Sequence, residues 1–359
     1  MTSNVCSLPF RRTVILTLDG ERVPGTVVPS KDGLTADYVL DRPLLPNRSY
    51  ALRISRSVLD GAGDPLDADV EAQFTTGTES TASGFIAFAR GTGMNVFTPD
   101  FVTDIWTARG DGSYARNLTN HPANDHSPAW SPDGSKITFT TDRSGKRAIF
   151  VMNADGSDPR RLIAGEFEDF SAEWSPDGKR IAFARKTNTS DSQIFVVGAD
   201  GSGAVAVTSG SGLRYGPSWS PDGQQIAYTH HAFSGGRYQT ANIRIVAADG
   251  SGFRSVTDFR SDAACPFARN PKWSPDGTKI LVYACQLGVN GIYQMAPDGS
   301  DIIRISPLGE AAWDPVWADG GKRIVFVKDH KLYSMTSLGQ ELIQISFGDD
   351  ADQQPAWRP

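Results

Sequence analysis

The stretch Trp130-Ser131-Pro132-Asp133-Gly134 recurs along the chain. Complete copies are Trp174–Gly178, Trp219–Gly223 and Trp273–Gly277, and reduced copies are Trp317-Ala318-Asp319-Gly320 and Trp357-Arg358-Pro359. A second motif, Asp-Gly-Ser, runs in step with it. The distance from the Gly of this second motif to the next Trp is 18 residues in five of six units, as from Gly112 to Trp130. It is 23 residues only from Gly250 to Trp273. Such regular self-similarity predicts a repeat architecture.

One unit predicts four short antiparallel strands. The first carries Trp and ends in the Pro-Asp-Gly turn, and an alternating run such as Ile137–Phe139 follows. The third is Ala148–Met152, and an Asp-Gly-Ser hairpin leads to the fourth near Arg160–Ile163. Proline presets φ and glycine accepts positive φ, so both motifs favour tight turns. Four such strands describe a propeller blade.

The ends of the repeat region predict how the ring closes. The run Phe85–Arg90 has no Trp turn before it, and Trp357 has no strand after it. If the segment around Pro355–Trp357 completes the sheet begun by Phe85–Arg90, the ring has no free edge. We therefore expect six blades over residues 85–359.

These Trp-Ser-Pro-Asp-Gly and Asp-Gly-Ser units resemble the TolB-type propeller repeat over residues 84–359. The resemblance implies a periplasmic, non-catalytic scaffold that binds the outer-membrane lipoprotein Pal. The chain departs from the family's pattern at its N-terminus, which carries no repeat unit.

Residues 1–77 predict a small separate domain. Short alternating runs separated by turn signals are typical of a β-sandwich. The segment from Leu44 to Gly77 resembles the second half of bacterial Ig-like modules of surface and exported proteins. Residues 78–84 are small and polar, so we expect a linker there. The predicted fold is thus all-β, with an Ig-like module followed by a six-bladed propeller.

Composition limits the classes of partner. The chain has 359 residues and a net charge of −6, which argues against a nucleic-acid surface. It has no apolar run of the ~20 residues that cross a bilayer. Arg11-Arg12 precede Val14–Leu16, which is too short for a signal core and predicts a strand. We expect a monomeric protein of the periplasm or cell surface whose export signal is absent from this sequence.

Three cysteines and one acidic loop leave alternatives open. Antiparallel pairing would bring Cys285 near residue 269, so Cys265 and Cys285 are either a disulfide or two buried thiols, with Cys6 left over. The acidic loop Asp60–Asp69 has carboxylates that suit Ca²⁺, but its turn sequence is ordinary for the module. We expect no cofactor, with Ca²⁺ as the alternative.

The loops predict a binding face. The Pro-Asp-Gly and Asp-Gly-Ser turns share one uniform face, and the longer turns and connections share the other. Two insertions, at residues 231–239 and 258–268, lie on the variable face, where repeat-specific insertions commonly mark binding. Their candidate residues are His231, Phe233, Arg237, Tyr238, Arg260 and Phe267.

Positions four and five residues before each Trp predict the mouth of the channel on the same face. Their aromatic and charged side chains suit an interface anchor or a sugar-stacking surface. The alternative is that they cap turns and pack between blades. The candidates are Asp125, His126, Asp169, Phe170, Arg214, Tyr215, Arg269, Trp313 and Asp352. The repeat Trp residues themselves are expected to pack between blades and to form core rather than site.

No motif indicates an enzyme. GxSxG and HExxH are absent, and His230 and His231, adjacent in a strand, would face opposite ways. The favoured hypothesis is a non-enzymatic exported scaffold that binds a protein or peptide of the cell envelope. The alternative is a carbohydrate-active, lyase-like propeller in which Asp125, Asp169 and Asp352, with His126, hold a divalent cation.

Overall fold

The computed structural model divides the chain into two compact units, Met1–Ser83 and Gly84–Pro359. The boundary falls at the end of the predicted linker. The residues that the structure describes are 14–18, 21–22, 25–29, 36–40, 49–55, 68–75, 84–91, 102–234, 237–258, 267–286, 288–307, 312–346 and 350–359.

The described residues of the first unit form strands. A four-stranded sheet has the order β2-β1-β5-β6, and two further strands, β3 and β4, pair with each other. The bounds are β1 Val14–Leu18, β2 Glu21–Arg22, β3 Gly25–Pro29, β4 Ala36–Leu40, β5 Ser49–Ile54 and β6 Val70–Thr75. Leu16 and Tyr50 are buried on the larger sheet. Val14–Leu16 is thus a strand, as expected, whereas the Ig-like identity stays a prediction, and most of the acidic loop 60–69 lies outside the described residues.

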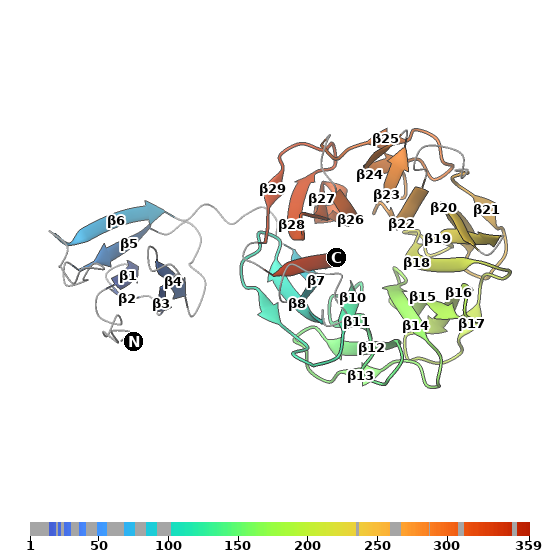
Figure 1. The fold of residues 1–359 in the computed structure, drawn as a ribbon, viewed down its shortest axis with the longest axis horizontal. Coiled ribbons are helices and arrows are strands. Elements are labelled where there is room, and N and C mark those ends of the chain that lie inside the picture. Colours follow the sequence, from blue (N-terminus) through green and yellow to red (C-terminus); the bar gives the residue numbers. More distant parts are fainter. Residues whose placement is uncertain are drawn as a thin grey trace, which may run out of the picture. The chain divides into compact units, whose positions relative to one another are not determined.

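The described residues of the second unit form six four-stranded sheets arranged in a ring (Figure 1). The first five blades in chain order are β10 Asp125–Trp130, β11 Lys136–Thr141, β12 Ala148–Asn153 and β13 Arg160–Arg161; β14 Asp169–Trp174, β15 Arg180–Lys186, β16 Ser192–Gly198 and β17 Val205–Ala206; β18 Leu213–Trp219, β19 Gln225–Ser234, β20 Arg237–Ala247 and β21 Arg254–Ser255; β22 Phe267–Trp273, β23 Ile280–Gln286, β24 Val289–Met295 and β25 Ile303–Arg304; and β26 Ala312–Ala318, β27 Arg323–Lys328, β28 Lys331–Thr336 and β29 Ile343–Gln344. We number these blades one to five. A 3₁₀ turn, η2, covers Asp319–Gly321.

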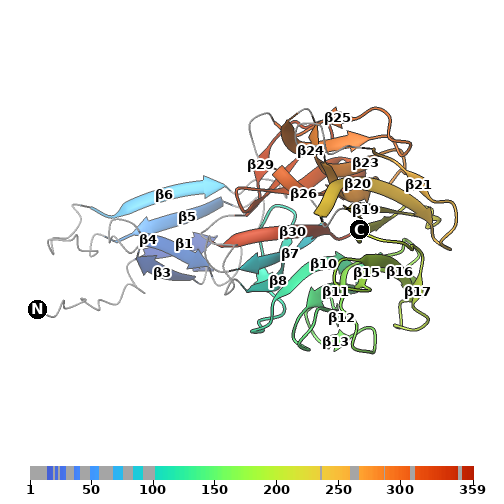
Figure 2. The ribbon, with the colours of Figure 1, turned by 45° about the vertical axis from the view of Figure 1, so that its right-hand side comes forward.

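The sixth blade joins the two ends of the propeller. Its strand order is β30 (Ala351–Trp357), β7 (Phe85–Gly91), β8 (Thr103–Arg109) and β9 (Arg116–Asn117). In the antiparallel register, Trp357 lies opposite Ile86, and the two strands run together in Figure 2. The predicted closure by the C-terminal strand is confirmed. No described helix is long and apolar enough to span a bilayer.

The hydrophobic core lies between adjacent blades. One cluster joins Ile86 and Phe88 of blade six to Val325 and Val327 of blade five. A corresponding isoleucine in the second strand of every blade is fully buried, as Ile137 and Ile181 are. Each sheet therefore needs its neighbours to remove its apolar faces from water.

The Trp-Ser-Pro-Asp-Gly motif has a structural reason for each residue. Ser131 Oγ donates to Asp133 Oδ1 over 2.6 Å, and Asp133 accepts from the backbone N–H of Ser135. These hydrogen bonds lower the pKa of Asp133 to about 2. Gly134 has φ +65°, and Pro132 lies beside Gly178 in the turn of the next blade. The motif thus closes its own turn and fits it against the neighbouring one.

The Asp-Gly-Ser motif performs the matching role at the outer strands. Gly201 has φ +88°, and a Cβ placed on it would overlap the backbone carbonyl of Leu162 in the preceding blade. Glycines 112, 299 and 339 lie equally close to a backbone carbonyl. Only glycine allows this close approach.

This contact predicts a stability difference between two glycines of one turn. Gly201→Ala must tolerate positive φ and also displace Leu162, so we expect a loss of about 2–4 kcal/mol in the free energy of unfolding. Gly203→Ala also has positive φ, but its Cβ meets open space, so we expect a loss of about 1–2 kcal/mol. Urea denaturation measures both, and equal losses would contradict the proposed contact.

Candidate functional site

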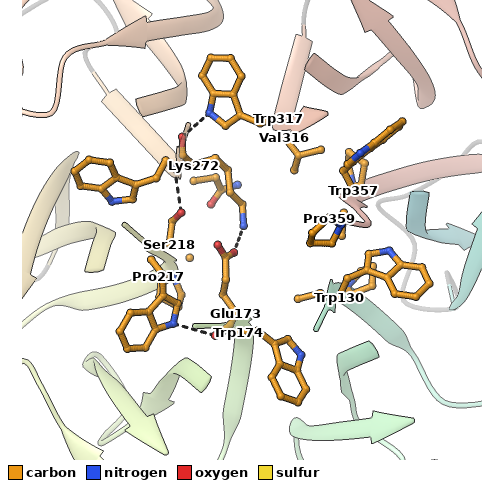
Figure 3. Close-up of a pocket in the computed structure, with 18 of the residues that line it drawn as sticks. Trp130, Glu173, Trp174, Pro217, Ser218, Lys272, Val316, Trp317, Trp357 and Pro359 are labelled. Carbon is orange, nitrogen blue, oxygen red and sulfur yellow. Dashed lines mark hydrogen bonds and ion pairs between the residues drawn. The ribbon is translucent and has the colours of Figure 1, made fainter. Parts of the chain in front are cut away.

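A cavity of about 570 Å³ occupies the channel and is lined by the inner strands of all six blades. It is lined by the six repeat Trp residues and by the prolines of the turns that follow them, so it extends to the uniform Pro-Asp-Gly face (Figure 3). Prediction had placed the channel mouth on the opposite, variable face. The Trp and Pro side chains that line the cavity are Trp130, Trp174, Trp219, Trp273, Trp317, Trp357, Pro132, Pro176, Pro221, Pro275 and Pro359.

The Trp rings have two roles. Trp130, Trp174 and Trp219 are almost fully buried and pack in the hydrophobic clusters, as predicted. The expectation that they are core rather than site is incomplete, because the same rings also form the cavity wall. Trp219 Nε1 donates to the carbonyl of Glu173 over 3.2 Å, and Trp317 Nε1 donates to that of Lys272 over 3.0 Å. In these two cases a ring of one blade fixes the inner strand of the preceding one.

Every inner strand is interrupted by a bulge three residues before its Trp. The register of each inner strand shifts at this point. The residue at the bulge has positive φ in all six blades: 52° at Ser127, 54° at Ser171, 58° at Gly216, 52° at Asn270, 50° at Asp314 and 49° at Gln354. All six residues line the cavity. A bulge re-aims side chains, so these positions turn toward the channel.

Hydrogen bonds connect several of these bulge residues across blades. Asn270 Nδ2 donates to Asp314 Oδ1 over 2.8 Å. Asp314 also accepts from the backbone N–H of Gln354, whose Oε1 accepts from the N–H of Ser127 over 2.8 Å. Burial in the channel raises the pKa of Asp314, although these hydrogen bonds act in the opposite direction. Sequence analysis missed this polar ring, although an X-Pro dipeptide at five of the six bulges was a usable signal.

The residues directly before each Trp form a second ring in the cavity. Four of them are small or apolar: Ala129, Ser218, Val316 and Ala356. The other two, Glu173 of blade two and Lys272 of blade four, form an ion pair that links two blades that are not neighbours (Figure 3). The cavity is therefore mainly aromatic and apolar, with one charged bridge.

The predicted acidic residues of the channel mouth are buried in ion pairs. Arg143 Nη2 lies 2.7 Å from Asp125 Oδ2, and Arg185 and Arg90 contact Asp169 and Asp352 at 2.7 and 2.6 Å. Each carboxylate is thus neutralised within its own blade. Among the described residues, no group of three or more His, Cys, Asp or Glu is placed to hold a metal. These ion pairs engage all three carboxylates of the alternative ligand set, Asp125, Asp169 and Asp352, and metal binding by this set stays a prediction.

Other predicted mouth residues pack against neighbouring groups of the propeller. Arg214 is buried and donates to the backbone carbonyls of Ser209, Gly210 and Gly212. Three ring contacts then place Arg147 over Phe170, Tyr215 beside His231 and Trp313 beside His330. None of these residues lines the cavity. Their role in binding stays a prediction.

The first insertion is a longer β-hairpin rather than a loop. β19 and β20 extend to the pairs Phe233↔Tyr238 and Ser234↔Arg237. The side chains of Phe233, Arg237 and Tyr238 lie outside the described residues.

Only the end of the second insertion is described. The guanidinium of Arg269 lies over the ring of Phe267, 4.5 Å from its centroid. In the strand register Phe267 lies opposite Cys285, two residues from the expected partner at 269. Cys285 is buried. Arg260, Cys265 and Cys6 lie outside the described residues, so the Cys265–Cys285 disulfide stays a prediction.

One hydroxyl and one imidazole meet at the edge of the cavity. His126 Nδ1 lies 3.0 Å from Ser127 Oγ. Desolvation and the neighbouring Arg147 lower the pKa of His126 to about 4. An imidazole with this pKa is a weak base at neutral pH, so the contact does not make Ser127 a strong nucleophile.

Comparisons with known proteins agree with the propeller. Residues 94–267 match the TolB beta propeller domain. A 50-residue segment is 38% identical to a Protein TolB homolog from Chlorobium luteolum, a match that covers 14% of this chain and 12% of that relative. The matched segment is thus a small part of the curated relative.

Solved structures show the same fold at low identity. TolB from Acinetobacter baumannii has a TM-score of 0.64 at 16% identity, over 97% of this chain and 83% of that one. A putative TolB from Agrobacterium tumefaciens has 0.56 at 19%, over 77% and 99%. Kuenenia stuttgartiensis hydrazine synthase has 0.62 at 15%, over 77% and 46%. Because an enzyme is among them, the fold alone does not decide between scaffold and catalyst.

The low pKa of His126 predicts a pH effect on stability. The unfolded chain gains a proton near pH 6.5, whereas folded His126 stays neutral down to about pH 4. Stability is therefore lost as pH falls through this window, by up to about 2 kcal/mol from this group between pH 7.5 and 5.

Urea denaturation of wild type and His126→Asn at both pH values measures this effect. We expect the variant to lose less stability between the two values. Equal losses would show that His126 is not the group responsible.

Proposed function

We propose that the chain, whose second unit is a β-propeller that matches the TolB beta propeller domain over residues 94–267, is a non-enzymatic binding scaffold of the cell envelope. Its ligand is a peptide segment of a protein partner, which enters the cavity lined by Trp and Pro. We place the protein in the periplasm or at the cell surface, in keeping with the similarity to TolB proteins.

The observation that carries this proposal is the ring of six Trp side chains around a cavity of about 570 Å³. Pockets of about 300–1,000 Å³ with aromatic walls and few polar groups are typical ligand sites. Trp rings offer a large contact area and lose little side-chain entropy on binding. Aromatic grooves also bind extended, proline-rich segments, whose conformation is largely preformed.

The polar groups of the cavity support binding more than catalysis. Glu173 is paired with Lys272, and Asp314 accepts hydrogen bonds from its neighbours. The hydroxyl of Ser218 accepts from the backbone N–H of Trp273. Among the described lining residues, the carboxylates are therefore already engaged rather than poised as an acid and base.

Two Trp residues on different faces give a test of the site. Peptides are first selected on the wild-type protein from a displayed library of random 12-residue sequences, and their affinity is measured by calorimetry. Trp317 lines the cavity, whereas Trp313 lies outside it in the same strand. We expect Trp317→Ala to weaken binding at least tenfold and Trp313→Ala to change it less than twofold.

The reverse result has a clear meaning. Loss of binding in Trp313→Ala with full binding in Trp317→Ala would move the site to the variable face that the sequence predicted. Failure to select any peptide would contradict the proposed function. The melting temperature of each variant shows whether it is folded.

A further inference from the structure

We propose that the Glu173–Lys272 ion pair determines which ligands bind. The pair opens for a peptide that carries an acidic and a basic group close together, so that Glu173 pairs with the basic group and Lys272 with the acidic one. This inference rests on the proposed binding function. It names the class of peptide that the cavity prefers.

The position of the pair sets it apart from the rest of the cavity. Both residues directly precede a repeat Trp, and the equivalent residues of the other four blades carry no charge. Ser218 of blade three lies between them, and its side chain is nearly fully buried (Figure 3). Within this ring of residues before Trp, the charges therefore occupy one side of the cavity, and the residues on the opposite side, Val316, Ala356 and Ala129, are apolar.

The exposure of the pair distinguishes it from the buried Arg–Asp ion pairs of the propeller. The side chains of Lys272 and Glu173 are 31% and 23% exposed, whereas those of Arg185 and Asp169 are 9% and 4% exposed. The cavity is lined by both members of the first pair and by neither member of the second. Only the first pair is open to a ligand in the cavity.

The backbone under the pair is held while its side chains are free to turn. The carbonyls of Glu173 and Lys272 accept from the indole N–H groups of Trp219 and Trp317. Lysine carries a compact charge on a flexible stem, so its ammonium can leave one carboxylate for another without moving the strand. The backbone of the site is thus held in place, whereas its charged side chains can change partners.

The apolar wall decides which ligands can make this exchange. A ligand that separates the pair but offers only one charge leaves the other ion unpaired beside Trp and Pro rings, which is costly. A neutral ligand can occupy only the space that the intact pair leaves. A ligand with both charges gives Glu173 a new cation and Lys272 a new anion, so both ions stay paired.

Four matched peptides test the inference on the full chain. They are Ac-PPKPEPP-NH2, the neutral Ac-PPQPQPP-NH2, and the singly charged Ac-PPKPQPP-NH2 and Ac-PPQPEPP-NH2. Proline keeps all four extended, so they differ mainly in charge. Tryptophan fluorescence reports their affinity. We expect the doubly charged peptide to bind at least tenfold more tightly than either singly charged one.

The matched variant is Glu173→Gln combined with Lys272→Met, which keeps both side chains near their original size. We expect the preference among the four peptides to fall to within twofold. The control is Glu341→Gln, which breaks the exposed Arg323–Glu341 pair outside the cavity and should leave the preference unchanged.

The outcomes separate this inference from the proposed function. If all four peptides bind equally to the wild type, or if the double variant keeps the preference, the inference is overturned and the peptide-binding cavity remains. If none of the four binds, the inference also fails, and the proposed function is then judged by the library-selected peptides alone.

Discussion

The contact between neighbouring blades is the constraint on which the propeller depends. No blade has a core of its own, because each buries its apolar residues against the next sheet. Such an arrangement is complete only when the last blade meets the first. The pairing of β30 with β7 provides this contact, and it joins residues more than 250 positions apart in the sequence, as Arg90 and Asp352 show. The Pro-Asp-Gly turns then lie against one another, and the Asp-Gly-Ser turns lie against the backbone of the preceding blade.

The bulge on each inner strand places its residue in the wall of the cavity. A regular strand would alternate its side chains between two faces. The residue with positive φ lies three positions before Trp, and both it and the residue directly before Trp line the channel. Trp lines the cavity from all six blades and the turn proline from five of them, whereas these two positions vary between blades.

Sequence reasoning predicted the repeated features and missed those that break the repeat. The spacing of Trp130 and its copies was enough to predict the strands, the turns and the closure by the C-terminal strand. The simple alternation of side chains did not reveal the bulges or the residues that line this cavity. The role of Asp125 was also hidden, since its partner Arg143 lies in the turn after β11 and looks like an ordinary surface residue in the sequence. The Glu173–Lys272 pair joins residues 99 positions apart, and only the ring geometry brings them together.

Division of labour between repeated and variable positions explains how one scaffold can hold a specific site. Trp, Pro and Gly carry the inter-blade contacts, so their replacement affects the whole ring. The side chain directly before Trp faces the cavity and makes few contacts between blades. Its size or charge can therefore change at little cost to the stability of the propeller. Because two of these six positions carry opposite charges, this ring adds no net charge to the cavity. The positive and negative charges nevertheless lie at different places in the wall. A ligand can therefore be recognised by the order of its own charges, with the apolar wall supplying contact area that does not depend on them.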